Sequence, residues 1–317
     1  MRVLVTGGAG FIGSEFVRSA LSNKFDYLDL EISKLTVVDA LTYAANFESL
    51  SEVSKNSKFD FVQGDIRDSS IIEKLVLDSD LVLNFAAESH VDNSIKDASD
   101  FVTTNFIGVF NILEAVKQKK GIRFIQISTD EVYGSTKRGA FNEKSNLNPS
   151  SPYSASKASA DLLALSYFVT HKLNLSITRS SNNYGRFQNT EKFIPKIITQ
   201  TINGSPLPIY GNGKNRRQWI HVTDNVRGIA CVCAKGKPGE IYNIGSGNEI
   251  SNIDLARMIL TLNATSESKI KFIEDRKGHD FRYAIKDRKL SKLGYSPKIN
   301  FIDGIKDTIS FYNSQSN

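Results

Sequence analysis

Two short stretches of this 317-residue chain carry side chains that could do acid–base chemistry. The first is Ser128-Thr129-Asp130-Glu131, which follows an apolar run, Ile122 to Ile127, that predicts a buried strand. The second, Tyr153-Ser154-Ala155-Ser156-Lys157, lies in a long amphipathic segment that predicts a helix. Because residues four apart on a helix share one face, we expect Tyr153 and Lys157 to lie side by side.

This pair predicts a base for oxidising an alcohol. A fixed ammonium beside a phenol favours the phenolate, so Lys157 is expected to lower the pKa of Tyr153. Thr129, Asp130 and Glu131 follow a strand, at the edge where open α/β sheets hold their ligands. A simple alcohol dehydrogenase needs only the tyrosine and the lysine. The additional carboxyl pair therefore indicates a further proton-transfer step after the oxidation; the alternative for this pair is a solvated turn.

The composition excludes several classes of protein. The chain is 40% hydrophobic and 23% charged, which is typical of a globular protein, and its length allows one large or two unequal domains. No apolar run approaches the roughly 18 residues of a membrane span, so no membrane association is expected. The net charge of +6 comes from basic residues that are spread out and not interleaved with aromatics. We therefore expect a solvated basic surface and no nucleic-acid partner.

The remaining reactive side chains predict a cytoplasmic protein without a metal site. Cys231 and Cys233 lie two apart in a predicted helix, so they point to different sides and are poor disulfide partners. The four histidines are scattered without metal-ligand spacing. The N-terminus runs from Met1 into a predicted strand, which is not the pattern of a signal peptide.

A glycine-rich turn predicts a dinucleotide site. Gly7 to Gly13 contains G-x-G-x-x-G and lies between a predicted strand, Arg2 to Thr6, and a predicted helix, Ser14 to Leu21. In that context the glycines let backbone N–H groups approach a pyrophosphate; the alternative is a turn without a ligand. Asp39 ends the next predicted strand, where an acid binds ribose hydroxyls and repels a 2′-phosphate, so NAD is favoured over NADP. A helix-capping aspartate is the alternative.

Strands and helices alternate through the first part of the chain, which predicts an α/β fold with a doubly wound parallel sheet. After about residue 186 the elements become shorter and the loops richer in Gly, Asn and Arg. We therefore expect an NAD-binding domain over 1–186 and a smaller substrate lobe over 187–317, with some elements exchanged between them. Lys192, Arg216, Arg217 and Arg276 are candidate anion ligands there, with exposed surface charge as the alternative.

Several motifs resemble the dTDP-glucose 4,6-dehydratase family of extended short-chain dehydrogenases/reductases. They are Gly7 to Gly13, Asp39 to Ala44, Ala86 to Asp92, Ser128 to Gly134, Ser151 to Lys157, Ser181 to Gly185 and Pro208 to Gly211. The resemblance covers nearly the whole chain. Its most specific element is the Asp130-Glu131 pair after Thr129.

The resemblance implies a role for each site residue. Tyr153, assisted by Lys157, would deprotonate the sugar 4-hydroxyl that Thr129 positions, Glu131 would remove the C5 proton, and Asp130 would protonate the departing 6-hydroxyl. The implied cofactor is NAD, bound by Gly7, Gly10, Phe11, Ile12, Gly13, Asp39, Ala40, Leu41, Thr42, Asp65, Ile66, Phe85, Ala86, Ala87, Ser89, Thr104, Tyr153, Lys157 and Asn183. The implied substrate is a nucleotide-diphospho-sugar, bound by Ser89, His90, Thr129, Asn182, Lys192, Phe193, Pro208, Ile209, Tyr210, Arg217, Asn252, Arg276 and His279. Relatives are usually homodimers that pair two helices, here 98–119 and 151–171, into a four-helix bundle.

The sequence departs from the family pattern in the substrate lobe. Gln218 replaces an Asp, Arg186 and Lys277 each replace a Pro, and Asn189-Thr190 replaces Phe-Pro. These changes leave the choice between thymidine and uridine nucleotides open. An epimerase or decarboxylase on the same scaffold is a second hypothesis, and an NAD-binding protein without catalysis is a third. The carboxyl pair disfavours simple epimerisation, and the complete set of five catalytic residues disfavours a non-catalytic protein.

Overall fold

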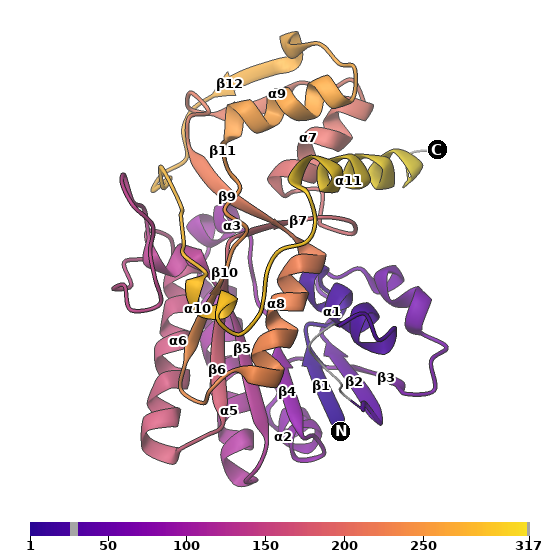
Figure 1. The fold of residues 1–317 in the computed structure, drawn as a ribbon, viewed down its shortest axis with the longest axis vertical. Coiled ribbons are helices and arrows are strands. Elements are labelled where there is room, and N and C mark those ends of the chain that lie inside the picture. Colours follow the sequence, from indigo (N-terminus) through magenta and orange to yellow (C-terminus); the bar gives the residue numbers. More distant parts are fainter. Residues whose placement is uncertain (26–30, 316–317) are drawn as a thin grey trace.

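The computed structural model describes residues 1–25 and 31–315, and a seven-stranded parallel sheet forms its centre (Figure 1). The strand order is β10-β6-β5-β4-β1-β2-β3. The strands are β1 (Arg2–Thr6), β2 (Lys34–Asp39), β3 (Phe59–Gln63), β4 (Leu81–Asn84), β5 (Arg123–Thr129), β6 (Leu175–Ser180) and β10 (Ile241–Ile244). The order reverses between β1 and β4, which opens a crevice at their carboxyl ends. The predicted doubly wound sheet is confirmed.

Helices cover both faces of this sheet because its strands are apolar on both sides. One face packs against α1 (Phe11–Leu21) and α8 (Val222–Lys235). The other face packs against α2 (Ser69–Leu77), α5 (Val109–Gln118) and α6 (Pro152–His171). α6 begins at a capping box in which Ser151 and Ser154 bind each other's backbone N–H groups. The local sequence thereby fixes where the helix carrying Tyr153 and Lys157 starts.

The predicted helix over 98–119 is interrupted. It consists of α4 (Ser99–Val102), a π-helical stretch, η2 (Thr103–Gly108), and α5. Such π-helical turns are frequent at functional sites, and this one faces the carboxyl edge of the sheet. Short elements elsewhere in the sheet domain are the helix α3 (Val91–Lys96) and the short helical segments η1 (Phe47–Val53) and η3 (Asp130–Tyr133).

A smaller lobe lies beyond the carboxyl edge of the sheet (Figure 1). It holds two small sheets, β11-β9-β7 and β12-β8, and a separate apolar core. Its elements are β7 (Asn182–Tyr184), α7 (Phe193–Ile202), β8 (Leu207–Tyr210), β9 (Arg216–His221), β11 (Glu249–Ser251), α9 (Asn252–Leu262), η4 (Glu267–Lys269), β12 (Ile270–Ile273) and α11 (Phe301–Gln315). Within the Ser181 to Gly185 motif, Asn182 to Tyr184 form the short strand β7 because they pair with β9.

The chain passes between the two parts more than once. β7 leaves the sheet domain to join the lobe, whereas α8 and β10 return from the lobe and complete the central sheet and its cover. The short helix α10 (Arg288–Ser291) then contacts β10. The crevice is consequently walled by segments from both halves of the sequence.

Over residues 1–25 and 31–315, no helix is long and apolar enough to cross a membrane.

Candidate active site

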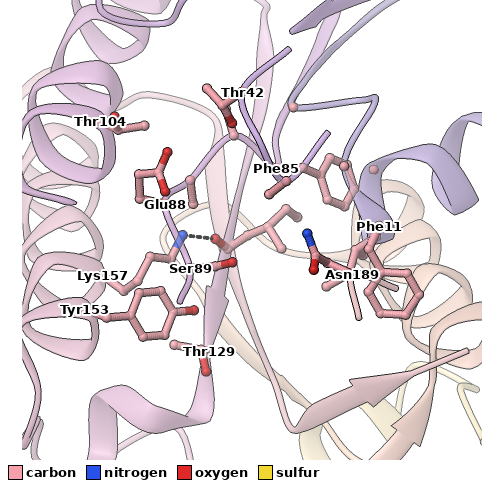
Figure 2. A pocket seen from close by; sticks show the side chains of 18 of the residues that line it. Phe11, Thr42, Phe85, Glu88, Ser89, Thr104, Thr129, Tyr153, Lys157 and Asn189 are labelled. Atoms are coloured by element: carbon pink, nitrogen blue, oxygen red, sulfur yellow. Dashed lines mark hydrogen bonds between the residues drawn. The ribbon is translucent and has the colours of Figure 1, made fainter. Parts of the chain in front are cut away.

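A cavity of about 750 Å³ occupies the crevice between the sheet and the lobe. Its walls are the β1–α1 turn, the ends of β2, β4, β5 and β6, the start of α6, and residues between Ser181 and Phe193. Figure 2 shows Phe11, Phe85, Glu88, Thr104, Thr129, Tyr153 and Lys157 around it. Its volume lies within the usual range for ligand pockets in proteins.

The glycine turn lets a ligand approach the backbone closely. Gly7 has φ +67°, and a Cβ there would lie 2.4 Å from the amide nitrogen of Ala86. A Cβ at Gly13 would lie 2.3 Å from the Gly7 carbonyl oxygen. No side chain caps the N-terminus of α1, so its free N–H groups face the cavity. These features fit the pyrophosphate of a dinucleotide such as NAD.

Asp39 braces this turn as well as lining the cavity. Its carboxylate accepts backbone hydrogen bonds from Ala9 at 2.9 Å and from Leu41 at 2.8 Å. Burial raises the pKa of Asp39, and the two hydrogen bonds oppose that rise. Of the predicted cofactor residues, all but Leu41 line the cavity. The side chain of Leu41 packs against the core of the sheet instead, so the prediction of its direct contact with the cofactor is not supported.

Tyr153 and Lys157 reach the cavity from α6, and Thr129 faces them from the end of β5 (Figure 2). Lys157 Nζ donates a 2.7 Å hydrogen bond to the carbonyl of Ile127, the dashed line in Figure 2. Burial lowers the pKa of Lys157 to about 8. The predicted neighbours therefore do share one helix face and one cavity.

The expected direction of the Tyr153 pKa is wrong for this structure. Burial, together with the carboxylates of Glu131 and Asp130, raises the pKa of Tyr153, and a hydrogen bond with Thr129 only partly offsets the rise. Burial is the largest cause, and folding also places both carboxylates near the phenol. For Tyr153 to act as a base, additional positive charge near the phenol is needed to stabilise its phenolate.

Asp130 and Glu131 are adjacent in sequence but have different surroundings. Asp130 is 2% exposed, and one of its carboxylate oxygens has no hydrogen-bond partner among the described residues. Burial and the charge of Glu131 hold the pKa of Asp130 well above its usual range. Burial also raises the pKa of Glu131, but Arg217, Arg276 and Lys192 all oppose that rise. The pair is therefore arranged with the protonated form favoured at Asp130.

The predicted substrate residues fall into two groups. Ser89, Thr129, Asn182, Lys192 and Phe193 line the cavity. The others do not line it: His90, Pro208, Ile209, Tyr210, Arg217, Asn252, Arg276 and His279. Of these, Ile209 is 1% exposed and packs in the lobe core, and its contact with a substrate stays a prediction.

The charged members of the second group lie close behind the cavity wall. The buried guanidinium of Arg217 lies 4.2 Å from the ring centre of Tyr283 and acts on Glu131 and Asp130. Arg276 and the hydroxyl of Tyr210 both bind the carboxylate of Asp92, at 3.3 Å and 3.2 Å. Asp92 belongs to α3, so these contacts join the lobe to the sheet domain.

The structure adds residues that the sequence pattern does not single out. Asn105, buried in η2, binds both backbone polar groups of Glu88 and donates to Ser156 on α6, each at 2.9 Å. Asp161 lies one turn beyond Lys157 and is fully buried. A π-helical turn and a buried aspartate inside a helix leave no periodic signal, so only the fold reveals them.

The departures from the family pattern lie mostly outside the cavity. Arg186 forms a bidentate ion pair with Asp307 on α11. Gln218 is buried beside Gly245, and its carbonyl oxygen has no partner among the described residues. Asn189 does line the cavity (Figure 2).

Comparison with known proteins places the chain in a family. The model of the family described as GDP-mannose 4,6 dehydratase matches residues 4–308. A dTDP-glucose 4,6-dehydratase of Streptomyces niveus is 45% identical over 98% of this chain and 93% of its own length. A low-salt glycan biosynthesis protein of Haloferax volcanii is 48% identical over 98% of each chain.

The fold comparison agrees. A crystal structure of a dTDP-glucose 4,6-dehydratase from Streptomyces venezuelae, solved with NAD bound, superposes with a TM-score of 0.97. It is 45% identical and covers 99% of this chain and 97% of its own. With a family model over nearly the whole length and relatives well above 40% identity, this chain belongs to the dTDP-glucose 4,6-dehydratase family.

Proposed function

We propose that this protein is an NAD-dependent dTDP-glucose 4,6-dehydratase. The observation that carries the proposal is the meeting of Thr129, Asp130, Glu131, Tyr153 and Lys157 in one cavity beside a glycine turn that fits a dinucleotide. Family membership supports the same activity. The reaction would convert dTDP-glucose into dTDP-4-keto-6-deoxy-glucose with no net change in redox state.

The first step assigned to these residues is oxidation at C4. The phenolate of Tyr153 takes the proton of the sugar 4-hydroxyl, and the hydroxyl of Thr129 holds the 4-oxygen. Lys157 lies one helical turn from Tyr153, and its charged form would favour the phenolate. The glycine turn and Asp39 would hold NAD, which would supply the hydride acceptor for C4 and the hydride donor for C6.

The second step is loss of water. The 4-ketone acidifies the C5 proton, which Glu131 removes, while Asp130 donates a proton to the 6-hydroxyl as it departs. This division follows from the surroundings, because three cations favour the carboxylate of Glu131 whereas burial favours the protonated form of Asp130. Glu131 then returns its proton to C5. The proton that Tyr153 took from the 4-hydroxyl is released to solvent, and Asp130 regains from solvent the proton that left with water, which completes the balance of protons.

We assign nucleotide-sugar binding to the lobe and NAD binding to the sheet domain, with a division near residue 186. Lys192 supports this assignment, because its amine enters the cavity from the lobe and donates to the Ser89 carbonyl at 2.8 Å. We further propose a cytoplasmic location, which the free thiols of Cys231 and Cys233 favour.

We also propose that the protein is a homodimer. The helical segments α4–η2–α5 and α6 contact each other, and Figure 1 labels α5 and α6 among them. Exposed apolar side chains lie along both segments. They are Val102, Ile107, Phe110, Leu162 and Val169, between 40% and 62% exposed. The same two segments of a second copy of this chain would bury these side chains in a four-helix bundle.

Mass spectrometry of the nucleotide sugar tests the activity. Purified protein is incubated with dTDP-glucose or with UDP-glucose, and Glu131→Gln with retained NAD is the matched control. Loss of one water from dTDP-glucose, absent in the control, is the expected result. Water loss only from UDP-glucose would assign a uridine nucleotide in place of the thymidine nucleotide. Inversion at C4 without water loss, seen by NMR, would contradict the dehydratase activity.

A further inference from the structure

A buried ion pair lies beneath the Tyr153–Lys157 face and takes no part in the chemistry proposed above. Arg179 Nε on β6 donates a 2.8 Å hydrogen bond to Asp161 Oδ2 on α6. The two side chains are 2% and 0% exposed, and neither lines the cavity. Removing two charges from water costs several kcal/mol per ion, so an interior ion pair is weak evidence of a purely stabilising role. Its position indicates another role.

The pair is connected to the catalytic residues through two neighbouring contacts. Lys157 Nζ binds the carbonyl of Ile127, and one turn further along α6 the hydroxyl of Ser128 donates to Asp161 Oδ2 at 3.0 Å. Consecutive residues of β5 thus hold consecutive turns of α6, immediately before Thr129. Asp161 Oδ1 is buried and has no partner among the described residues.

The charges facing Lys157 come from three elements. On its own helix are the phenol of Tyr153 and the carboxylate of Asp161. Arg179 on β6 binds Asp161, and Asp130 on η3 lines the same cavity as Lys157. Burial lowers the pKa of Lys157, and the carboxylate of Asp161 is the charge that opposes this fall. Arg179 neutralises part of the Asp161 charge because it binds one carboxylate oxygen directly.

We infer that Asp161 is a positioning residue that keeps the Lys157 amine in its charged form, with Arg179 limiting the strength of its field. The other function of the pair is to align α6 with β5, so that Tyr153, Lys157 and Thr129 keep their relative positions. The inference rests on the proposed function only in that Lys157 acts with Tyr153.

Two single variants that break the same ion pair test this electrostatic role. Asp161→Asn removes the negative charge and Arg179→Met removes the positive one. Purified wild type and variants are acetylated with trace acetic anhydride between pH 6 and pH 11, and mass spectrometry follows the peptide carrying Lys157, with exposed Lys144 as the internal reference. The rate reports the fraction of neutral amine. We expect the Lys157 titration to move down by roughly one pH unit in Asp161→Asn and upward in Arg179→Met.

Opposite shifts of the Lys157 titration in the two variants indicate an electrostatic effect. Loss of packing would shift the titration in the same direction in both variants. Since Asp161→Asn leaves Arg179 buried without its partner, the double variant Asp161→Asn/Arg179→Met is made as well. The double variant should be more thermally stable than Asp161→Asn alone, and its Lys157 should still titrate at a lower pH than in the wild type. An unchanged Lys157 titration in both Asp161 variants would overturn the inference. Labelling needs no sugar turnover, so a wild type that fails to dehydrate dTDP-glucose contradicts the proposed function alone.

Discussion

Asp130 holds a proton that the proposed reaction uses, but burial of its carboxyl lowers the stability of the folded protein when that carboxyl is charged. Its carboxyl is buried with one oxygen unpartnered among the described residues, and its pKa is raised in the folded protein. The folded state therefore binds a proton more tightly than the unfolded state does. Between the unfolded and folded pKa values, stability must fall as pH rises, because the charged form is penalised only in the folded protein.

Asp130→Asn is consequently expected to stabilise the protein at neutral pH and to abolish water loss. An unpartnered buried polar group costs about 1–3 kcal/mol, and an ionised one costs more, so the gain should be about 1 kcal/mol or more. Thermal unfolding at pH 5 and pH 8 measures it, with the larger gain at pH 8. Asp60→Asn, a substitution on the exposed edge strand β3, is the control and should change stability by less than about 0.5 kcal/mol. Equal effects of both substitutions would contradict this account.

Glu131→Gln should separate the two chemical steps. The amide cannot take the C5 proton, whereas Tyr153, Lys157 and Thr129 remain intact for C4 oxidation. Loss of a positioned general base lowers turnover by roughly 10²–10⁴-fold. We expect absorbance at 340 nm to rise on addition of dTDP-glucose and to persist in the variant, but to decay in the wild type. Absence of any rise in a variant that retains NAD would show that Glu131 is needed earlier.

At the scale of elements, η2 connects the cofactor side of the cavity to the catalytic helix. Asn105 is 1% exposed and binds the Glu88 peptide on one side and Ser156 of α6 on the other. The segment from Phe85 to Ser89 lies along the cavity, so its backbone position determines how a dinucleotide fits. The π-helical turn sets Asn105 at this junction.

Asn105→Ala is expected to weaken NAD retention as well as stability. It leaves two backbone groups of Glu88 without partners, a loss of about 2 kcal/mol or more. Calorimetric titration of NAD into the stripped protein and thermal unfolding measure the two effects. Thr103→Ala, which truncates an exposed side chain of the same π-helical stretch, should change neither by much. Loss of stability with unaltered NAD affinity would restrict Asn105 to a structural role.

The elements show what sequence patterns can and cannot predict here. Strand β1 and helix α6 carry strong periodic or turn signals, and they appear where the patterns place them. β7 has only three residues and gains its strand geometry from β9, which is remote in sequence. The direction of the Tyr153 pKa shift likewise depends on burial and on carboxylates brought near by folding, so spacing within one helix could not give it. The charges of Arg217 and Arg276 reach Glu131 through the same long-range contacts.

At the scale of the whole molecule, the two helical segments of the proposed dimer belong to the sheet domain, on the side where α6 holds the catalytic residues. Leu162 and Val169 lie on the outer face of α6, five and twelve residues beyond Lys157. Pairing with a second copy would therefore restrain the same helix that positions Tyr153 and Lys157. Assembly and activity are expected to depend on each other for this reason.

Leu162→Glu should convert the dimer into a monomer with reduced turnover. Leu162 is 58% exposed, so the charge is tolerated in an isolated chain but would be buried against its own copy in the bundle. Light scattering coupled to size exclusion, at micromolar protein concentration, measures the mass beside that of the wild type. Ile302→Glu is the matched control, because Ile302 is 46% exposed and lies on α11, away from these helices. The Ile302→Glu variant should remain a dimer. A monomeric wild type, or a Leu162→Glu protein of dimer mass, would refute the proposed interface, whereas a monomer that also turns over more slowly would connect the bundle to the geometry of the active site.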